Sequence, residues 1–264
     1  FWGQSVLADI VRNGEWLVAP FVAAFLFGKI TSSFNDALSM VNLAQRLFAG
    51  DPPRQPLPCP EDDKLPVIAV QIASRNEPIE VLSQTIASAL AIDYPREKIE
   101  VQIIDDSSAD SRAYQDLLYF YNNSELIRKY KSERSESSVT LIHRDQPSGF
   151  KAGGLNNAWR RSKAAYFLIL DSDSLVSPDV CRKLVPEFIH NKKLAYARTK
   201  IRATNPRSTL YSAAISASND IQAEYYHPVK FRFGFVYFNG HNGMVSREAL
   251  EAVNGWPEEQ PSED

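Results

Sequence analysis

The sequence predicts an α/β protein built on a mostly parallel, doubly wound sheet, and two observations carry this prediction. Short apolar runs alternate with amphipathic stretches of helical spacing, an order typical of parallel strands joined by helices. One run, residues 165–170, is continuously apolar, which is typical of a strand buried on both faces. A chain of 264 residues, 44% of them hydrophobic, is also long enough to bury a core of ordinary size.

The expected elements follow this alternation from residue 65 onward. Strands are expected at 67–74, 100–104, 139–143, 165–170 and 194–199, and a strand, a glycine-bearing turn and a return strand at 234–246. Helices are expected at 79–90, 111–131, 154–162, 178–189, 208–226 and 247–253. Because parallel strands share a carboxyl end, their ends should meet at one edge of the sheet, where α/β proteins bind ligands.

The residues before position 65 have a different character. The apolar run 16–28 is shorter than the ~20 residues that cross a bilayer as a straight helix, but Trp16 and Lys29 flank it, and both residue types favour membrane interfaces. Residues 34–48 have amphipathic helical spacing. We therefore expect a membrane-associated helical segment over residues 1–50, with a buried helix of a soluble domain as the alternative.

A proline-rich stretch separates this segment from the rest of the chain. Five prolines between residues 51 and 60 cannot lie inside regular secondary structure, so residues 51–64 are expected to be a linker. Residues 65–264 then form the second domain. We expect the chain to be a piece of a longer protein whose domain is truncated at its C-terminal end.

Composition excludes several classes of function. A net charge of -3 argues against a nucleic-acid partner bound through a broad basic surface. The two cysteines lie far apart and provide neither a disulfide framework nor metal-ligand spacing. No Gly-x-Gly-x-x-Gly follows the first strand and no Walker loop occurs, so a dinucleotide or a P-loop nucleotide is disfavoured.

Two carboxylates follow the buried run 165–170. Asp171 and Asp173 are separated by one serine, and carboxylates at this spacing repel each other unless a cation lies between them. A hard divalent metal, Mg²⁺ or Mn²⁺, is therefore expected at this strand end. The alternative is an ordinary polar turn, because Asp and Ser are common turn residues.

Other strand ends and one loop carry polar groups that would meet this pair. The first strand runs into residues 74–77, and the second ends in Asp105 and Asp106. Lys151 lies in a glycine-containing loop before the helix expected at 154–162, where backbone amides and the helix dipole favour anions such as phosphate. Arg144 is a second possible cation, and for both residues an ordinary surface position is the alternative.

Taken in order, these motifs resemble those of the processive family-two glycosyltransferases, the cellulose-synthase-like membrane glucan synthases. The motifs are Arg75-Asn-Glu-Pro78, Ile104-Asp-Asp-Ser-Ser108, Lys151-Ala-Gly-Gly-Leu-Asn156, Asp171-Ser-Asp173, Phe238-Asn-Gly-His-Asn242 and Ser262-Glu-Asp264. Each is weak alone, but together they cover about three quarters of the chain in the family's order. The resemblance implies a GT-A-type nucleotide-sugar-binding domain.

The resemblance also implies roles for individual residues. A UDP-sugar donor, with Mg²⁺ or Mn²⁺ against its diphosphate, would be bound by Asn76, Glu77, Asp105, Asp106, Lys151, Asp171 and Asp173. Asp264 would be the general base that deprotonates the acceptor hydroxyl, while Gly240 and His241 would border the acceptor. Two positions depart from the family, because Ser262 stands where threonine is usual and Asn239 replaces the more usual residue beside Gly240.

The activity implied is that of a metal-dependent, inverting glycosyltransferase, an enzyme that moves glucose from UDP-glucose to a growing β-glucan or a related polysaccharide. Its partners would be the UDP-sugar, a glycan or lipid-linked acceptor and membrane lipid, but no nucleic acid. The resemblance places it at the cell inner or plasma membrane with a cytoplasmic catalytic domain. The family's Gln-x-x-Arg-Trp acceptor motif would lie beyond Asp264.

Three alternatives compete with this interpretation. A non-processive transferase making a lipid-linked sugar would share the fold and the apolar segment. A haloacid-dehalogenase-type phosphatase would use Asp171 as its nucleophile, but that motif usually ends the first strand, and here other strands precede it. A non-catalytic binding module would be expected to have lost carboxylates that are all present here.

Overall fold

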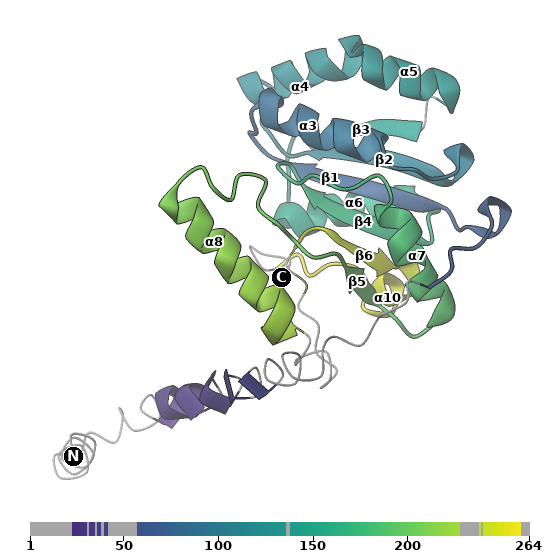
Figure 1. The fold of residues 1–264 in the computed structure, drawn as a ribbon. Coiled ribbons are helices and arrows are strands. Elements are labelled where there is room, and N and C mark those ends of the chain that lie inside the picture. Colours follow the sequence, from purple (N-terminus) through teal and green to yellow (C-terminus); the bar gives the residue numbers. More distant parts are fainter. Residues whose placement is uncertain are drawn as a thin grey trace, which may run out of the picture. The chain divides into compact units, whose positions relative to one another are not determined.

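The structure is a computed structural model that describes residues 23–30, 32–34, 36–37, 40–41, 57–135, 138–227, 238 and 240–259. The chain divides into two compact units. One unit joins Phe1–Pro53 to Ile201–Val236, and the other joins Arg54–Lys200 to Tyr237–Asp264. The second unit contains the sheet (Figure 1).

The sheet has six strands in the order β3-β2-β1-β4-β6-β5. Its strands are β1 (Ile68–Ser74), β2 (Ile99–Asp105), β3 (Val139–His143), β4 (Tyr166–Asp171), β5 (Tyr196–Arg198) and β6 (Gly243–Ser246). The first four are mutually parallel, whereas β6 runs antiparallel to both β4 and β5. The mostly parallel sheet predicted from the alternation of strands and helices is therefore confirmed.

Helices cover both faces of this sheet, as Figure 1 shows. On one face, alternate strand residues such as Ile68 and Val70 join a core with α3, α4, α5 and α7. On the other face, the intervening residues, Ala69 and Phe167 among them, pack with Leu155 of α6 and Leu250 of α10. This alternation follows from the period of two along a strand. The helical elements of this unit are η1 (Asp62–Lys64), α3 (Ile79–Leu90), η2 (Arg96–Lys98), α4 (Arg112–Asn123), α5 (Glu125–Glu133), α6 (Phe150–Arg161), α7 (Val180–His190) and α10 (Arg247–Ala252).

Three element boundaries predicted from the sequence were wrong. The single helix expected at 111–131 is two helices, because the hydroxyl of Ser124 accepts from the N–H of Ile127 and begins α5. The helix expected at 154–162 begins at Phe150, directly after Gly149, which adopts a left-handed φ of 69°. The strand expected at 194–199 is only Tyr196–Arg198.

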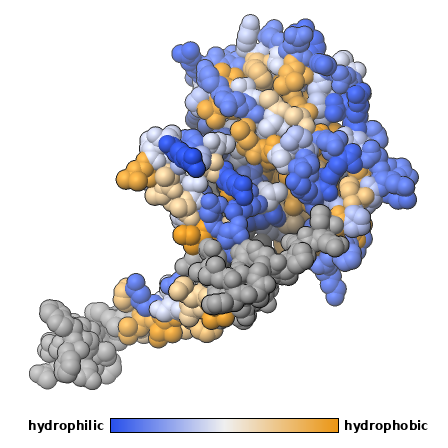
Figure 2. Space-filling model, in the orientation of Figure 1, coloured by the Kyte–Doolittle hydropathy of each residue, from blue (hydrophilic) through white to orange (hydrophobic). Residues whose placement is uncertain are grey.

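The other unit contains α8 (Leu210–Ile221), which continues as the π-helical turn η4 (Gln222–Tyr226). A capping box between Thr209 and Ser212 begins α8, so the helix expected at 208–226 is present with a change of winding near its end. Leu210 is 89% exposed, and apolar side chains lie on the surface of this unit (Figure 2).

Two sequence predictions fall wholly or partly outside the described residues. Most of the apolar run 16–28 does so, although residues 23–30 are helical, with Phe25 and Phe27 exposed. No helix in the described part of the chain is long and apolar enough to span a bilayer. Of the two strands expected at 234–246, the return strand is β6, and residues 228–237 are not described.

Candidate active site

The strand register brings the polar strand ends together at the carboxyl edge of the sheet. Ser74 at the end of β1 lies opposite Asp105 at the end of β2. On the other side of β1, Ala73 lies opposite Asp171 of β4, and Asp105 in turn lies opposite His143 of β3. The predicted convergence of the strand ends is therefore confirmed.

Lys151 joins three segments of this edge. Its ammonium group donates to Oδ1 of Asp171 at 2.6 Å and to the carbonyl oxygen of Gly240 at 2.8 Å. The side chains of Lys151 and Asp171 are 22% and 36% exposed, so the pair is partly desolvated but open to a ligand. Lys151 was expected in a loop and lies instead in the first turn of α6, because that helix begins four residues earlier than predicted. The helix thus holds the ammonium group against the end of β4.

The turn after β4 is held by hydrogen bonds to neighbouring segments, while the side chain of Asp173 is exposed. The hydroxyl of Thr85 donates to the carbonyl oxygen of Ser172 at 2.7 Å. Nδ1 of His241 lies 3.4 Å from Oγ of Ser174. Of the predicted acceptor residues, His241 therefore contacts the segment that carries the two aspartates, and Gly240 is linked to Asp171 through Lys151.

Asp105 and Asp106 have different surroundings despite being adjacent. Asp105 is 1% exposed and accepts hydrogen bonds from Oγ of Ser107 at 2.8 Å, while Nδ1 of His143 lies 3.1 Å from its Oδ2. Asp106 accepts two hydrogen bonds from Arg144: Nε donates to Oδ1 at 2.6 Å, and Nη2 donates to Oδ2. Asp105 is therefore a buried residue that holds Ser107 and His143 in place at the edge of the sheet. Asp106 is slightly more exposed and forms a forked ion pair with Arg144.

Arg144 also holds the loop that leads into α6. Its guanidinium donates at 2.8 Å to the carbonyl oxygens of Ser148 and Phe150. Gly153 and Gly154 pack against the same guanidinium, and a Cβ on Gly153 would overlap the carbonyl oxygen of Ser148. Gly153 of the Lys-Ala-Gly-Gly motif therefore leaves space for Arg144 and the Ser148 carbonyl, and Gly154 leaves space for Ile104.

The end of β1 contributes a turn and the end of β3 an aromatic pair. The backbone N–H of Asn76 donates to Oγ of Ser107 at 2.8 Å, with φ of 56° at Asn76, and Glu77 is half-buried beside it. His143 stacks on Tyr114 with ring centroids 3.8 Å apart. Sequence reasoning missed His143 and Tyr114, although the position of His143 at the end of a predicted strand could have indicated it.

The two aspartates suit a metal that is shared with a bound phosphate. Within the described residues, no group of three or more His, Cys, Asp or Glu side chains could hold a metal ion. Mg²⁺ commonly binds one or two protein carboxylates and completes its shell with water and substrate phosphate oxygens. Asp171 and Asp173 match that donor set, and Lys151 provides a further positive charge beside it. Asp264, the predicted base, lies outside the described residues.

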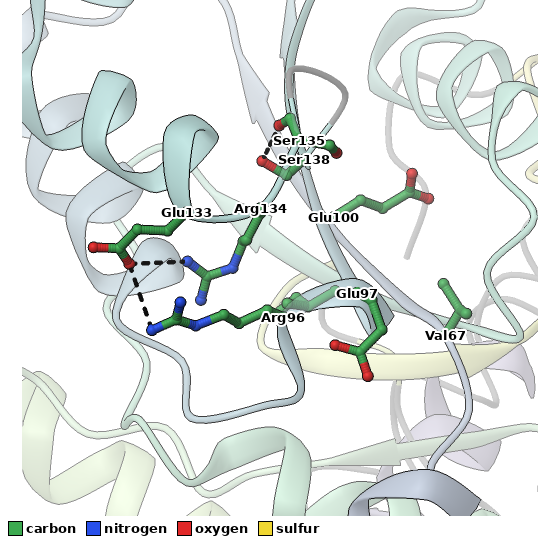
Figure 3. A pocket seen from close by; sticks show the side chains of 9 residues that line it. Val67, Arg96, Glu97, Glu100, Glu133, Arg134, Ser135 and Ser138 are labelled. Atoms are coloured by element: carbon green, nitrogen blue, oxygen red, sulfur yellow. Dashed lines mark hydrogen bonds and ion pairs between the residues drawn. The ribbon is translucent and has the colours of Figure 1, made fainter.

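A separate pocket of about 500 Å³ lies at the opposite edge of the sheet. Its residues precede or begin β1, β2 and β3: Val67, Arg96, Glu97, Ile99, Glu100, Glu133, Arg134, Ser135 and Ser138. In Figure 3, the carboxylate of Glu133 faces the guanidinium groups of Arg96 and Arg134. Its Oε2 lies 3.8 Å from Nη2 of Arg96 and 4.0 Å from Nη1 of Arg134. The pocket is thus remote from the polar strand ends, which lie at the carboxyl edge.

Comparison with known proteins provides a family. The model of the family described as glycosyl transferase family 2 matches residues 69–253. Glucomannan 4-beta-mannosyltransferase 7 of Arabidopsis thaliana is 29% identical over 209 residues, covering 75% of this chain and 35% of that protein. Probable glucomannan 4-beta-mannosyltransferase 6 of Oryza sativa subsp. japonica is 26% identical, and the match covers 98% of this chain and 47% of that protein. Cellulose synthase 2 of Novacetimonas hansenii is 27% identical, covering 80% and 12%.

The chain thus spans less than half the length of these curated proteins. Among solved structures, the mannosyltransferase PcManGT from Pyrobaculum calidifontis, in complex with GDP-Man and Mn²⁺, superposes with a TM-score of 0.57. The sequence identity is 19%, and the match covers 88% of this chain and 59% of that one. At that identity the likeness supports the fold alone.

Proposed function

Because the chain belongs to glycosyl transferase family 2, among its cellulose-synthase-like members, we propose that it transfers a hexose from a nucleotide sugar to a glycan at the carboxyl edge of the sheet. The observation that carries this proposal is the contact of Lys151 with both Asp171 and Gly240. One side chain then joins a donor-binding carboxylate to the segment that would border the acceptor.

The chemistry follows from where charge develops. Breaking the bond between the sugar and the diphosphate leaves negative charge on the leaving group, and a positioned cation lowers the barrier. Lys151 provides an ammonium group there, and Asp171 and Asp173 would hold Mg²⁺ or Mn²⁺. When bound, such an ion neutralises diphosphate oxygens as a Lewis acid.

The acceptor needs a base on the opposite face of the sugar. Asp264 is proposed to take the proton of the acceptor hydroxyl. A single displacement with one such base and no covalent intermediate inverts the anomeric centre. Gly240 and His241 would lie beside the acceptor.

The nucleoside is proposed to bind at the ends of β1 and β2, beside Asn76, Glu77, Asp105 and Asp106, where Asp106 is paired with Arg144. Glucose from UDP-glucose is one candidate donor. Mannose from GDP-mannose is the second, because two matching plant proteins are named as mannosyltransferases. We propose a membrane-bound full-length protein with this domain on the cytoplasmic side.

The test uses the full-length protein with UDP-glucose and GDP-mannose as donors. We expect one donor to be consumed with release of its nucleoside diphosphate, and removal of divalent metal by EDTA to stop transfer. Asp173→Asn and Asp264→Asn should each abolish transfer, and only Asp173→Asn should weaken metal-dependent nucleotide binding. Wild-type turnover by Asp264→Asn would remove Asp264 as the base. A single added sugar instead of a polymer would favour the non-processive alternative.

A further inference from the structure

Asn156 of α6 makes an unusually complete set of contacts with a distant loop. This side chain is 1% exposed. Its Nδ2 donates to the carbonyl oxygen of Trp256 at 2.9 Å and to Oε1 of Glu258 at 2.6 Å. Its Oδ1 accepts from the backbone N–H of Trp256 at 2.8 Å and from Nε1 of Trp159 at 2.9 Å. Both N–H groups and both lone pairs of the amide are therefore used.

The same loop fits closely against the start of α6. A Cβ on Gly149, the residue before the helix, would lie 2.7 Å from Cβ and from Oε2 of Glu258. Gly255 has a φ of 91°, and a Cβ there would lie 2.5 Å from Oδ1 of Asn156. Two glycines thus provide the space in which residues 254–258 dock on α6. We call this segment the docked loop.

The docked loop lies near the reactive groups and leads to the proposed base. Glu258 packs against Gly149, which lies two residues before Lys151 in the chain. The ammonium group of Lys151 in turn binds Asp171. Asp264 follows Glu258 by six positions, and six extended residues span at most about 20 Å. Where the docked loop is held therefore limits where Asp264 can reach.

From these contacts we propose that Asn156 is a positioning residue for the transfer reaction. It fixes the docked loop, from which the chain continues to the proposed base Asp264, on the helix that carries Lys151. The inference rests on the proposed function for the role of Asp264. The docking of the loop itself rests only on the hydrogen bonds of Asn156.

The test compares variants of the full-length protein. Asn156→Asp replaces two donors with acceptors that face the Trp256 carbonyl and the Glu258 carboxylate. We expect it to lower kcat about 10- to 100-fold, because misplacing a reacting group by about 1 Å costs that much. Affinity for the nucleoside diphosphate should change less than about twofold, because the substitution leaves the residues proposed to bind the nucleotide sugar in place. Hydrogen exchange should show lost protection in residues 254–259 but not in β1 or β4.

Two substitutions of Glu258 test the same contact with a smaller expected effect on kcat. Glu258→Ala removes the acceptor for Nδ2 of Asn156 and should lower kcat, whereas Glu258→Gln keeps an oxygen at that position and should restore it. The matched control is Glu259→Ala, whose side chain is exposed, and we expect it to behave as the wild type.

Several results would overturn the proposal. They are a wild-type kcat for Asn156→Asp, equal losses in Glu258→Gln and Glu258→Ala, or a loss of nucleotide affinity that matches the loss of kcat. Absence of transfer by the wild-type protein would instead refute the proposed function. Hydrogen exchange needs no activity, so unchanged protection of residues 254–259 in Asn156→Asp would refute the docking role by itself.

Discussion

The ammonium group of Lys151 lies 2.6 Å from Oδ1 of Asp171, the first of two aspartates at the end of β4. A positive charge therefore already sits on a carboxylate that is proposed to bind a divalent metal. The same ammonium group would bind the donor diphosphate. Lys151 should consequently oppose the binding of a metal alone and favour the binding of a metal together with a nucleotide.

Lys151→Ala should separate these two effects. Mn²⁺ alone should bind roughly 30-fold more tightly, which corresponds to the ~2 kcal/mol of repulsion between a single and a double positive charge about 4 Å apart in water. Nucleoside diphosphate in the presence of Mn²⁺ should bind about 10- to 100-fold more weakly, because a hydrogen bond to a charged group contributes about 1.5–3 kcal/mol. Calorimetric titrations measure both affinities. Lys163→Ala, at an exposed position, is the control, and a loss of both affinities in Lys151→Ala would contradict the prediction.

Arg144→Ala should destabilise the sheet domain. It leaves Asp106 without its forked partner, where the two side chains are only 11% and 10% exposed, and it removes one donor from each of the carbonyl oxygens of Ser148 and Phe150. Breaking such a pair costs about 3 kcal/mol or more, equivalent to a fall in Tm of about 6–12 °C. Arg144→Lys should recover only part of this, because lysine lacks the planar fork.

A control for Arg144 lies on the surface. Arg112→Ala removes an ion pair with Asp116 in which the arginine side chain is 94% exposed, and it should change Tm by less than about 2 °C. Scanning fluorimetry of the three variants measures these differences. Equal effects of Arg144→Ala and Arg112→Ala would show that the buried fork contributes nothing special to stability.

Gly153→Ala should destabilise the protein although alanine ordinarily stabilises a helix. A Cβ at this position would overlap the carbonyl oxygen of Ser148 and lie 2.8 Å from Nη1 of Arg144. Overpacking of this kind costs about 1–3 kcal/mol, so Tm should fall. Gly28→Ala, in a helix with nothing within 4 Å of a Cβ, should leave Tm unchanged or raise it. A higher Tm for Gly153→Ala would mean that the 148–153 backbone can move away freely.

Glu100→Gln should stabilise the protein increasingly as pH rises. Burial raises the pKa of the Glu100 carboxyl above its ordinary value, against the opposing effects of the Ser162 hydroxyl and Arg247. The folded state then binds the proton more tightly than the unfolded state, so the wild type loses stability as pH rises through the folded pKa. Glutamine cannot ionise and keeps an acceptor for Ser162.

The measurement is Tm against pH for both proteins. The advantage of Glu100→Gln should be small near pH 4 and grow as the pH rises toward 7. Glu97→Gln, at an exposed position in the same pocket, should change Tm little at either pH. A constant difference across the range would contradict the assignment to ionisation of Glu100.

Local patterns were sufficient to predict the strands and most of the helices. The apolar run 165–170 became the buried strand β4, and the alternating patterns gave β1 to β3 in parallel. The boundary errors arose where a single residue decided the outcome. Ser124 divides one amphipathic stretch into two helices, and Gly149 in a left-handed conformation begins α6 early. Capping and φ choices of this kind depend on contacts that periodicity does not contain.

The candidate site was predicted as a collection of strand ends but not as a network. Asp105, Asp106, Asp171 and Lys151 could be named because each follows or borders a predicted element. Which groups pair with which could not be predicted from the sequence. Lys151 binds the carbonyl of Gly240, 89 residues away, and Arg144 binds Asp106, 38 residues away. His143, Tyr114 and Asn156 acquired their significance only from those long-range contacts.

The sequence by itself determined the fold class, the family and the positions of the carboxylates, because each depends on residue types at short spacing along the chain. Only the tertiary structure decided which carboxylate each cation neutralises and which loop rests on α6. Those choices depend on register across the sheet and on the space that Gly149, Gly153 and Gly255 leave open. Such distances arise when segments far apart in the chain pack together.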